Sequence, residues 1–138
     1  MNIWLRILLS SIGASLLGSM ILWVVFGILP GSTAGFTISL YVSIFMLSSI
    51  VISISSLILT FIFMSHVQRL SGHSVLSTSV SFAIAGAMVY FLINLCIMIF
   101  SGDKVMVGKF FSSGVFLFSI FVGTLYGASF GLVFCRLR

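Results

Sequence analysis

The chain has 138 residues, of which 61% are hydrophobic and only 5% are charged, and its formal net charge is +5. This composition cannot supply the solvated surface of a soluble globular domain, so that class is excluded. Asp, Glu, Lys and Arg are absent from residues 7–68, 70–102 and 110–135. Because a charge near the bilayer centre costs about 2.5–3.5 kcal/mol, the sequence predicts an integral membrane protein in contact with the lipid bilayer.

Long apolar segments predict one all-α membrane domain over residues 1–138, folded as a four-transmembrane-helix bundle. A helix needs about 20 residues to cross the hydrocarbon core, and the second span is long enough to tilt. The first apolar run ends at Pro30 and is longer than the core of a cleaved signal peptide, so we expect it to be retained. A polar linker is expected at residues 65–77. The expected spans are residues 7–29, 36–64, 78–100 and 111–134.

The positive charges predict the orientation of the spans. If both termini are cytoplasmic, four arginines lie inside and two lysines lie outside, which favours an N-in/C-in topology by the positive-inside rule. The cationic balance then marks topology and contacts with anionic headgroups, so no nucleic-acid partner is expected. The compact plan with arginines inside indicates a bacterial inner membrane. The residues concerned are Arg6, Arg69, Arg136 and Arg138 inside, and Lys104 and Lys109 outside.

Small residues repeat every four positions in two of the expected spans. This spacing places them on one side of a helix, where they allow a second backbone to approach closely. We expect the first span to pack against the fourth, although the same stripes could instead form an interface between subunits of a homo- or hetero-oligomer. The stripes are Ser119, Gly123, Gly127 and Gly131 in the fourth span, and Ser10, Ala14 and Gly18 in the first, with Ser11, Ser15 and Ser19 in an adjacent row.

Hydroxyl groups form a third stripe, in the second span, at Ser49, Ser53, Ser56 and Thr60. They could line a polar path or join neighbouring helices by hydrogen bonds, and we favour the second role. In the third span, Tyr90 and Asn94 lie one turn apart on the same side.

An unpaired amide is costly in hydrocarbon, so Asn94 needs a partner. We expect that partner to be the hydroxyl of Tyr90 or a serine of the second span.

The remaining reactive side chains do not form a recognisable catalytic set. Asp103 is the only carboxylate side chain, so a carboxylate pair is impossible. His66 and His73 share one linker without a third metal ligand nearby. Cys96 and Cys135 are expected near opposite ends of their spans, too far apart for a disulfide. The sequence therefore predicts no enzyme activity, no cofactor and no metal site.

Two classes of function remain. We expect a non-catalytic membrane protein that acts through helix–helix contacts, as an accessory subunit of a membrane complex or as an immunity protein against a membrane-inserting toxin. The alternative is a small oligomeric channel or carrier for a neutral or weakly hydrated solute, lined by the hydroxyl stripe of the second span and by Tyr90 and Asn94 of the third.

Overall fold

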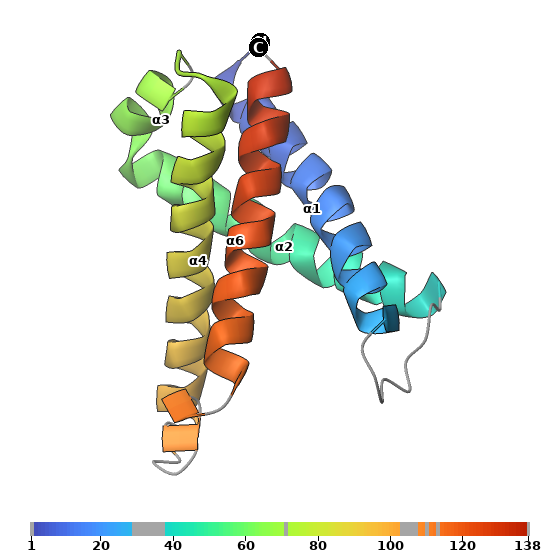
Figure 1. Cartoon of the computed structure of the whole chain (residues 1–138). Helices are drawn as coiled ribbons and strands as arrows, with labels where there is room; N and C mark the ends of the chain where they lie inside the picture. Colours follow the sequence, from blue (N-terminus) through green and yellow to red (C-terminus); the bar gives the residue numbers. More distant parts are fainter. Residues whose placement is uncertain are drawn as a thin grey trace.

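The computed structural model describes residues 2–28, 38–70, 72–102, 108–109, 111–112 and 114–137. These residues form helices without any strand, and four of the helices are long and apolar enough to cross a membrane (Figure 1). The predicted all-helical fold with four helices of membrane-spanning length is therefore confirmed for this part of the chain. The expected turn at Pro30 lies outside it, as do Asp103, Lys104 and Arg138. The helices are α1 (Ile3–Ile28), α2 (Ile38–Ile62), α3 (Met64–Leu70), α4 (Val75–Phe100) and α6 (Gly114–Arg136).

The expected linker at residues 65–77 is wrong over most of its first half, because Met64–Leu70 is the helix α3. Polar residues made this segment look like a loop. The helix is amphipathic instead: Val67 and Leu70 are buried, whereas Arg69 is exposed. Burial of two apolar side chains stabilises a helix this short, which would be marginal in isolation.

The next helix, α4, begins three residues before the expected start of the third span. Ser74 is its N-cap, and its side-chain oxygen accepts a hydrogen bond of 3.3 Å from the backbone N–H of Ser77. This bond satisfies one of the N–H groups that the first turn of a helix leaves without a partner. The hydroxyl of Thr78, which is fully buried, donates to the carbonyl of Leu70 and ties α4 to the end of α3.

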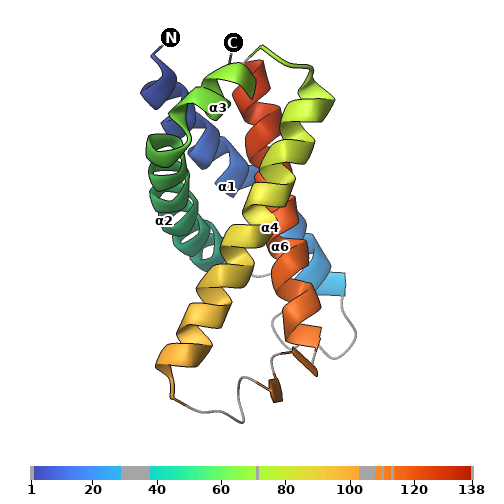
Figure 2. The same ribbon diagram turned by 90° about the vertical axis from the view of Figure 1, so that its left-hand side faces the viewer.

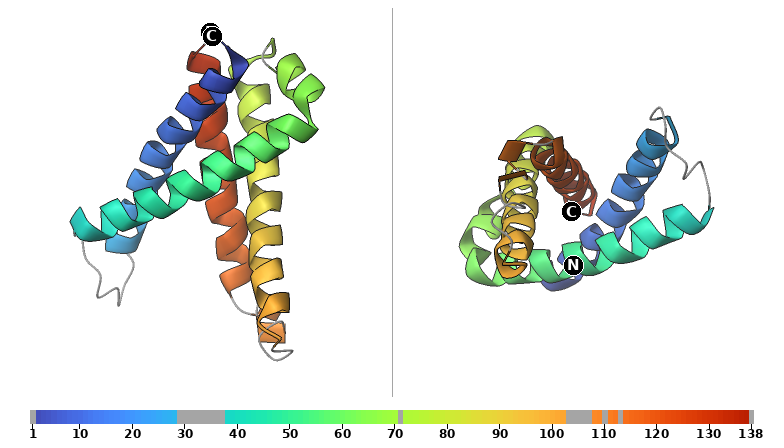
Figure 3. Two further views of the ribbon diagram at one scale, coloured as in Figure 1. Left: turned by 180° about the vertical axis from the view of Figure 1, so that it is seen from behind. Right: turned by 90° about the horizontal axis from the view of Figure 1, so that it is seen from below.

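The four long helices form a splayed arrangement. Helices α4 and α6 run antiparallel and side by side, with the most extensive contact in the described residues (Figure 2). Helix α1 packs on α6 and on α2, and α2 crosses the other helices obliquely toward α3 (Figure 3). The start of α1 and the end of α6 lie at the same end of the molecule, as an even number of spans requires.

The core lies where α1 meets α6, and α2 and α3 contribute one residue each. Its buried apolar residues are Ile7, Ala14, Leu22, Ile52, Val67, Val122, Tyr126, Phe130 and Phe134. Ser10, Ser11, Ser15 and Ser19 of α1 are also fully buried, so the interior contains hydroxyl groups as well as apolar side chains.

Candidate functional site

The glycine stripe of α6 lies directly against α4. A Cβ atom added to Gly127 would overlap the carbonyl oxygen of Phe82, and one added to Gly131 would lie 2.6 Å from the Cα of Ser79. Gly123 meets the backbone of α4 in the same way. The two backbones are thus in contact, which allows strong dispersion and weak Cα–H···O bonds between the helices.

We expected this stripe to face the first span, and the structure places it against α4 instead. Helix α1 does pack on α6, but on another side of it. Gly13 lies against Val133, and Gly18 lies against the ring of Tyr126. The fourth member of the α6 stripe, Ser119, is buried.

The small residues of α1 are buried, and some of their neighbours bind other helices. Ala14 and Ser10 have no exposed surface, and the Ser10 hydroxyl donates to the carbonyl of Arg6 in its own helix. Ser19, one residue from Gly18, hydrogen-bonds the hydroxyl of Tyr126 in α6 at 3.2 Å. Residues beside the expected α1 stripe therefore supply specific contacts between helices.

Serine–serine hydrogen bonds join α1 to α2. Ser11 and Ser56 lie 2.9 Å apart, and Ser19 and Ser48 lie 3.0 Å apart, each distance measured between the hydroxyl oxygens. Ser56 belongs to the hydroxyl stripe expected in the second span, and Ser48 adjoins it. These two pairs thus hold α2 to α1, which is the adhesive role favoured from the sequence for Ser56.

The other members of the hydroxyl stripe bond within α2 or remain at its surface. Ser49 donates to the carbonyl of Phe45, and Thr60 donates to the carbonyl of Ser56, both at 2.7 Å. Ser53 is half-buried. Such bonds to the preceding turn satisfy a hydroxyl in an apolar medium without a partner helix.

Asn94 also finds its partner within its own helix. Its side-chain amide donates to the backbone carbonyl of Tyr90 at 2.8 Å, whereas we expected the Tyr90 hydroxyl or a serine of the second span. The side chain is half-buried. The ring of Tyr90 instead stacks on Tyr126, with ring centroids 6.1 Å apart.

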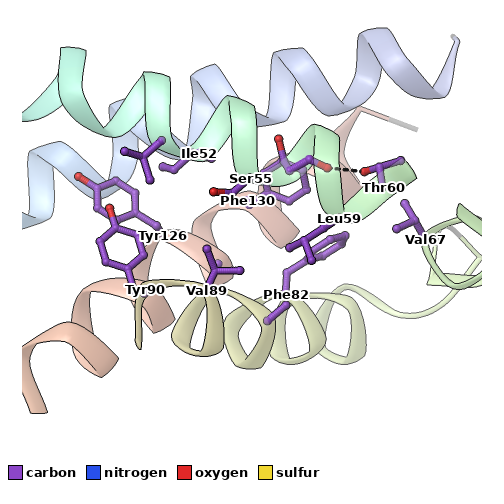
Figure 4. A pocket seen from close by; sticks show the side chains of 16 residues that line it. Ile52, Ser55, Leu59, Thr60, Val67, Phe82, Val89, Tyr90, Tyr126 and Phe130 are labelled. Carbon is purple, nitrogen blue, oxygen red and sulfur yellow. Dashed lines mark hydrogen bonds between the residues drawn. The ribbon is translucent and has the colours of Figure 1, made fainter. Parts of the chain in front are cut away.

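A cleft separates α2 from the α4–α6 pair (Figure 4). The side chains of α2 form one wall and those of α4 the other, and α6 contributes two glycines of its stripe and two aromatic rings. Val67 of α3 lies at one end, and the stacked Tyr90 and Tyr126 lie at the other. The lining includes Ser55, Ser56, Leu59, Thr60, Phe82, Ala85, Val89, Gly123, Gly127 and Phe130.

Three residues expected to line a polar path do line this cleft, namely Ser56, Thr60 and Tyr90. Ser49, Ser53 and Asn94 do not appear among the lining residues. Sequence reasoning missed Ser55 and Tyr126. Ser55 lies one position away from the stripe that the four-residue spacing singled out, and Tyr126 precedes Gly127 on the neighbouring side of α6.

Arg6 makes a contact between helices, whereas the sequence predicted only a role in membrane topology for this residue. It is buried, and its Nε donates to the carbonyl oxygen of Phe134 at 2.8 Å, with a second bond from a terminal nitrogen. Its guanidinium carbon lies 3.7 Å from the centroid of the Phe134 ring. Phe134 is in the last turn of α6, where carbonyls lack helical partners and the helix dipole favours a cation. Arg6 therefore joins α1 to the end of α6.

The described residues contain no group of three or more His, Cys, Asp or Glu side chains that could hold a metal ion. Cys96 is exposed and Cys135 is buried, and both are free thiols. Comparisons with protein-family models, with curated proteins and with solved structures found no match. The contacts define a helical protein with four apolar helices that are able to span a membrane.

Proposed function

We propose that this chain is a non-catalytic integral membrane protein that acts through contacts with other transmembrane helices, as an accessory subunit of a membrane complex or as an immunity protein against a membrane-inserting toxin. The unequal burial of its helices supports this proposal. In the most apolar part of α1 and of α6, 44% of the residues are buried, against 11% in α2 and 0% in α4. Helices α2 and α4 therefore offer most of the surface on which a partner could pack.

The one-sided packing of α2 supports the same proposal. Helix α2 packs on α1 and on α3, and it has no extensive contact with α4 within the described residues. It is joined to α1 by two serine pairs, which contribute about 0.6 kcal/mol each on average in membrane proteins, and by the edge-to-face contact of Trp23 with Tyr41. A helix held on one side only gains stability when a second protein covers its other side.

We further propose that both termini face the cytoplasm of a bacterial cell, with the protein in the inner membrane. Arg6 and Arg136 belong to the end of the molecule where the chain begins and ends, and α3 carries Arg69 at the same end (Figure 2). The positive-inside rule favours the cytoplasm for this end. A reactive thiol probe that cannot cross the membrane tests this, because a cysteine introduced at Arg69 must then be protected in intact cells.

An oligomeric channel or carrier for a neutral or weakly hydrated solute is the second candidate. The observation in its favour is the row of Ser55, Thr60 and Tyr90 along the cleft. Against it, the hydroxyl of Thr60 already donates to a carbonyl of its own helix. The cleft also opens between α2 and α4, so a solute path needs a second copy to close it.

The decisive experiment is purification of the tagged chain from its natural host in native nanodiscs, followed by native mass spectrometry. A photo-crosslinking amino acid at Ile58 of α2 or at Met88 of α4, both exposed, is expected to capture a stoichiometric foreign protein. The same group at Leu16, on the exposed side of α1, serves as the control.

A chain that purifies only as a monomer, without crosslinks from either position, refutes the interaction proposal when its deletion also leaves membrane complexes and toxin sensitivity unchanged. A symmetric homo-oligomer crosslinked through Ile58 would favour the channel or carrier instead. Flux of neutral solutes into reconstituted liposomes would then be measured.

A further inference from the structure

We propose that the chain moves as two helix pairs, α1–α2 and α4–α6, and that the hydrogen bond between Ser19 and Tyr126 sets how far the two pairs separate. Loss of this bond then widens the cleft at its Tyr90 end. This inference goes beyond the proposed function, because it concerns movement within this chain and requires no protein partner.

The division into two pairs follows from the contacts between helices. Helix α4 packs extensively on α6 and α1 packs on α2, whereas α2 has no extensive contact with α4 or α6 within the described residues. The two pairs meet where α1 lies on α6, and from the end where the chain begins α1 diverges from α6 (Figures 1 and 3). One pair can therefore rotate relative to the other about this end without breaking the contacts inside either pair.

Two hydrogen-bonded contacts join α1 to α6. Arg6 binds the carbonyl of Phe134 at the end of the molecule where the termini lie, which is also the end where rotation would be centred. The hydroxyl groups of Ser19 and Tyr126 lie 3.2 Å apart, about 20 Å further along α1 at 1.5 Å per residue. A contact so far from the centre of rotation restrains the separation of the pairs more strongly than Arg6 does.

The Ser19–Tyr126 bond belongs to a chain of hydroxyl groups whose direction is fixed. Ser48 donates its proton to the carbonyl of Phe45 at 3.0 Å, and a hydroxyl has one proton, so Ser48 accepts from Ser19. Ser19 in turn accepts from Tyr126. All three side chains that carry these hydroxyls are buried. Tyr126 is therefore the first donor of a chain that runs from α6 through α1 to α2.

Tyr126 also forms the Tyr90 end of the cleft. Its ring lines the cleft and stacks on Tyr90 of α4, and its other side lies against Gly18 of α1 (Figure 4). The serine pairs and the contact of Trp23 with Tyr41 keep α2 on α1. When the hydroxyl of Tyr126 no longer holds Ser19, α2 therefore moves away from α4 together with α1.

Distances between spin labels in nanodiscs test this movement, after both native cysteines have been replaced by alanine. Labels at Met46 of α2 and Leu92 of α4, both exposed, report the width of the cleft. In Tyr126→Phe, which keeps the ring and removes the hydroxyl, the fraction of molecules at longer Met46–Leu92 distance is expected to rise about threefold. This is the change that loss of one interhelical hydrogen bond of average strength predicts.

Tyr90→Phe is the matched control, because it removes a hydroxyl from the other ring of the same stack, and no described residue hydrogen-bonds that hydroxyl. It is expected to leave the distances unchanged. Labels at Met20 and Met46, which lie within the α1–α2 pair, are expected to report the same distance in wild type and Tyr126→Phe.

Ser19→Ala gives a second test, since it removes the same bond from the α1 side. It is expected to lengthen the Met46–Leu92 distance, and Tyr126→Phe is expected to add nothing further in the combined variant. Coincident Met46–Leu92 distances in Tyr126→Phe and Tyr90→Phe would overturn the proposal. An equal change in the Met20–Met46 distance would do the same, because the α1–α2 pair would then not move as a unit.

Discussion

Replacement of Gly127 by alanine tests the close contact between α4 and α6. The added methyl group would overlap the carbonyl oxygen of Phe82 and would lie 2.8 Å from the Cα of Ala83. Both neighbours are backbone atoms, so no side-chain rotation relieves the overlap. The helices must therefore part by about 1 Å, and a gap of 0.5–1 Å already loses about a quarter to a half of the dispersion energy between facing atoms. We expect Gly127→Ala to lower the free energy of unfolding by about 2–3 kcal/mol, at the upper end of the cost of overpacking.

Gly114→Ala is the matched control for this prediction. Gly114 belongs to the same helix, but a Cβ atom added there meets no atom within 4 Å. This substitution is expected to leave stability unchanged or to raise it by up to about 1 kcal/mol, because alanine is the better helix former. The assay is reversible unfolding in sodium dodecyl sulfate, followed by circular dichroism. If Gly127→Ala unfolds at the same detergent fraction as Gly114→Ala, the backbone contact between α4 and α6 is refuted.

Two further variants test how α1 is joined to the other helices. Arg6→Gln removes the charged hydrogen bonds to Phe134 and the contact with its ring, and we expect it to lower the free energy of unfolding by about 2–3 kcal/mol in the same assay. A loss below 0.5 kcal/mol, the size typical of surface substitutions, would argue against this contact. Ser19→Ala removes the bonds to α2 and α6 and is expected to cost about 1 kcal/mol. Ser43→Ala, an exposed serine bonded only to its own helix, should be neutral, and equal effects of the two serine variants would contradict the interhelical role of Ser19.

The four long apolar helices could be predicted from the sequence because exclusion of charge is a strong signal over long segments. The break between α2 and α3 could not be predicted in this way. Phe63 ends the regular α2 helix, yet Val67 donates its backbone N–H to the carbonyl of Phe63, so a new helix starts at once. The polar residues that suggested a linker are on the exposed side of α3. The segment forms a helix because Val67 and Leu70 are buried in the protein interior. The local sequence does not reveal that burial.

In the candidate site, too, the local sequence predicts that a helix contact exists but not which helices form it. The four-residue spacing of Gly123, Gly127 and Gly131 indicates a groove for a second helix, but spacing alone does not say which helix enters it. The choice of α4 depends on Gly86, whose own added Cβ atom would overlap the carbonyl oxygen of Gly123. Beside Gly86, the α4 residues that meet the stripe are Ser79, Ala83 and Ala87, which also repeat every four positions, so the sequence did contain a signal for this pairing. The inward position of Arg6 became visible only with the end of α6 beside it.

The cleft exists because α4 packs closely on α6, whereas α2 packs on α1. Glycine contacts draw α4 onto α6, and they involve backbone atoms, so α4 cannot move toward α2 without loss of that contact. Two serine pairs and the contact of Trp23 with Tyr41 hold α2 to α1. Neither side can close the gap, and side chains too small to fill it, such as Ser55 and Ala85, line its walls. The side chains on the two walls therefore lack the dispersion contacts across the gap that a closed helix–helix interface would give them.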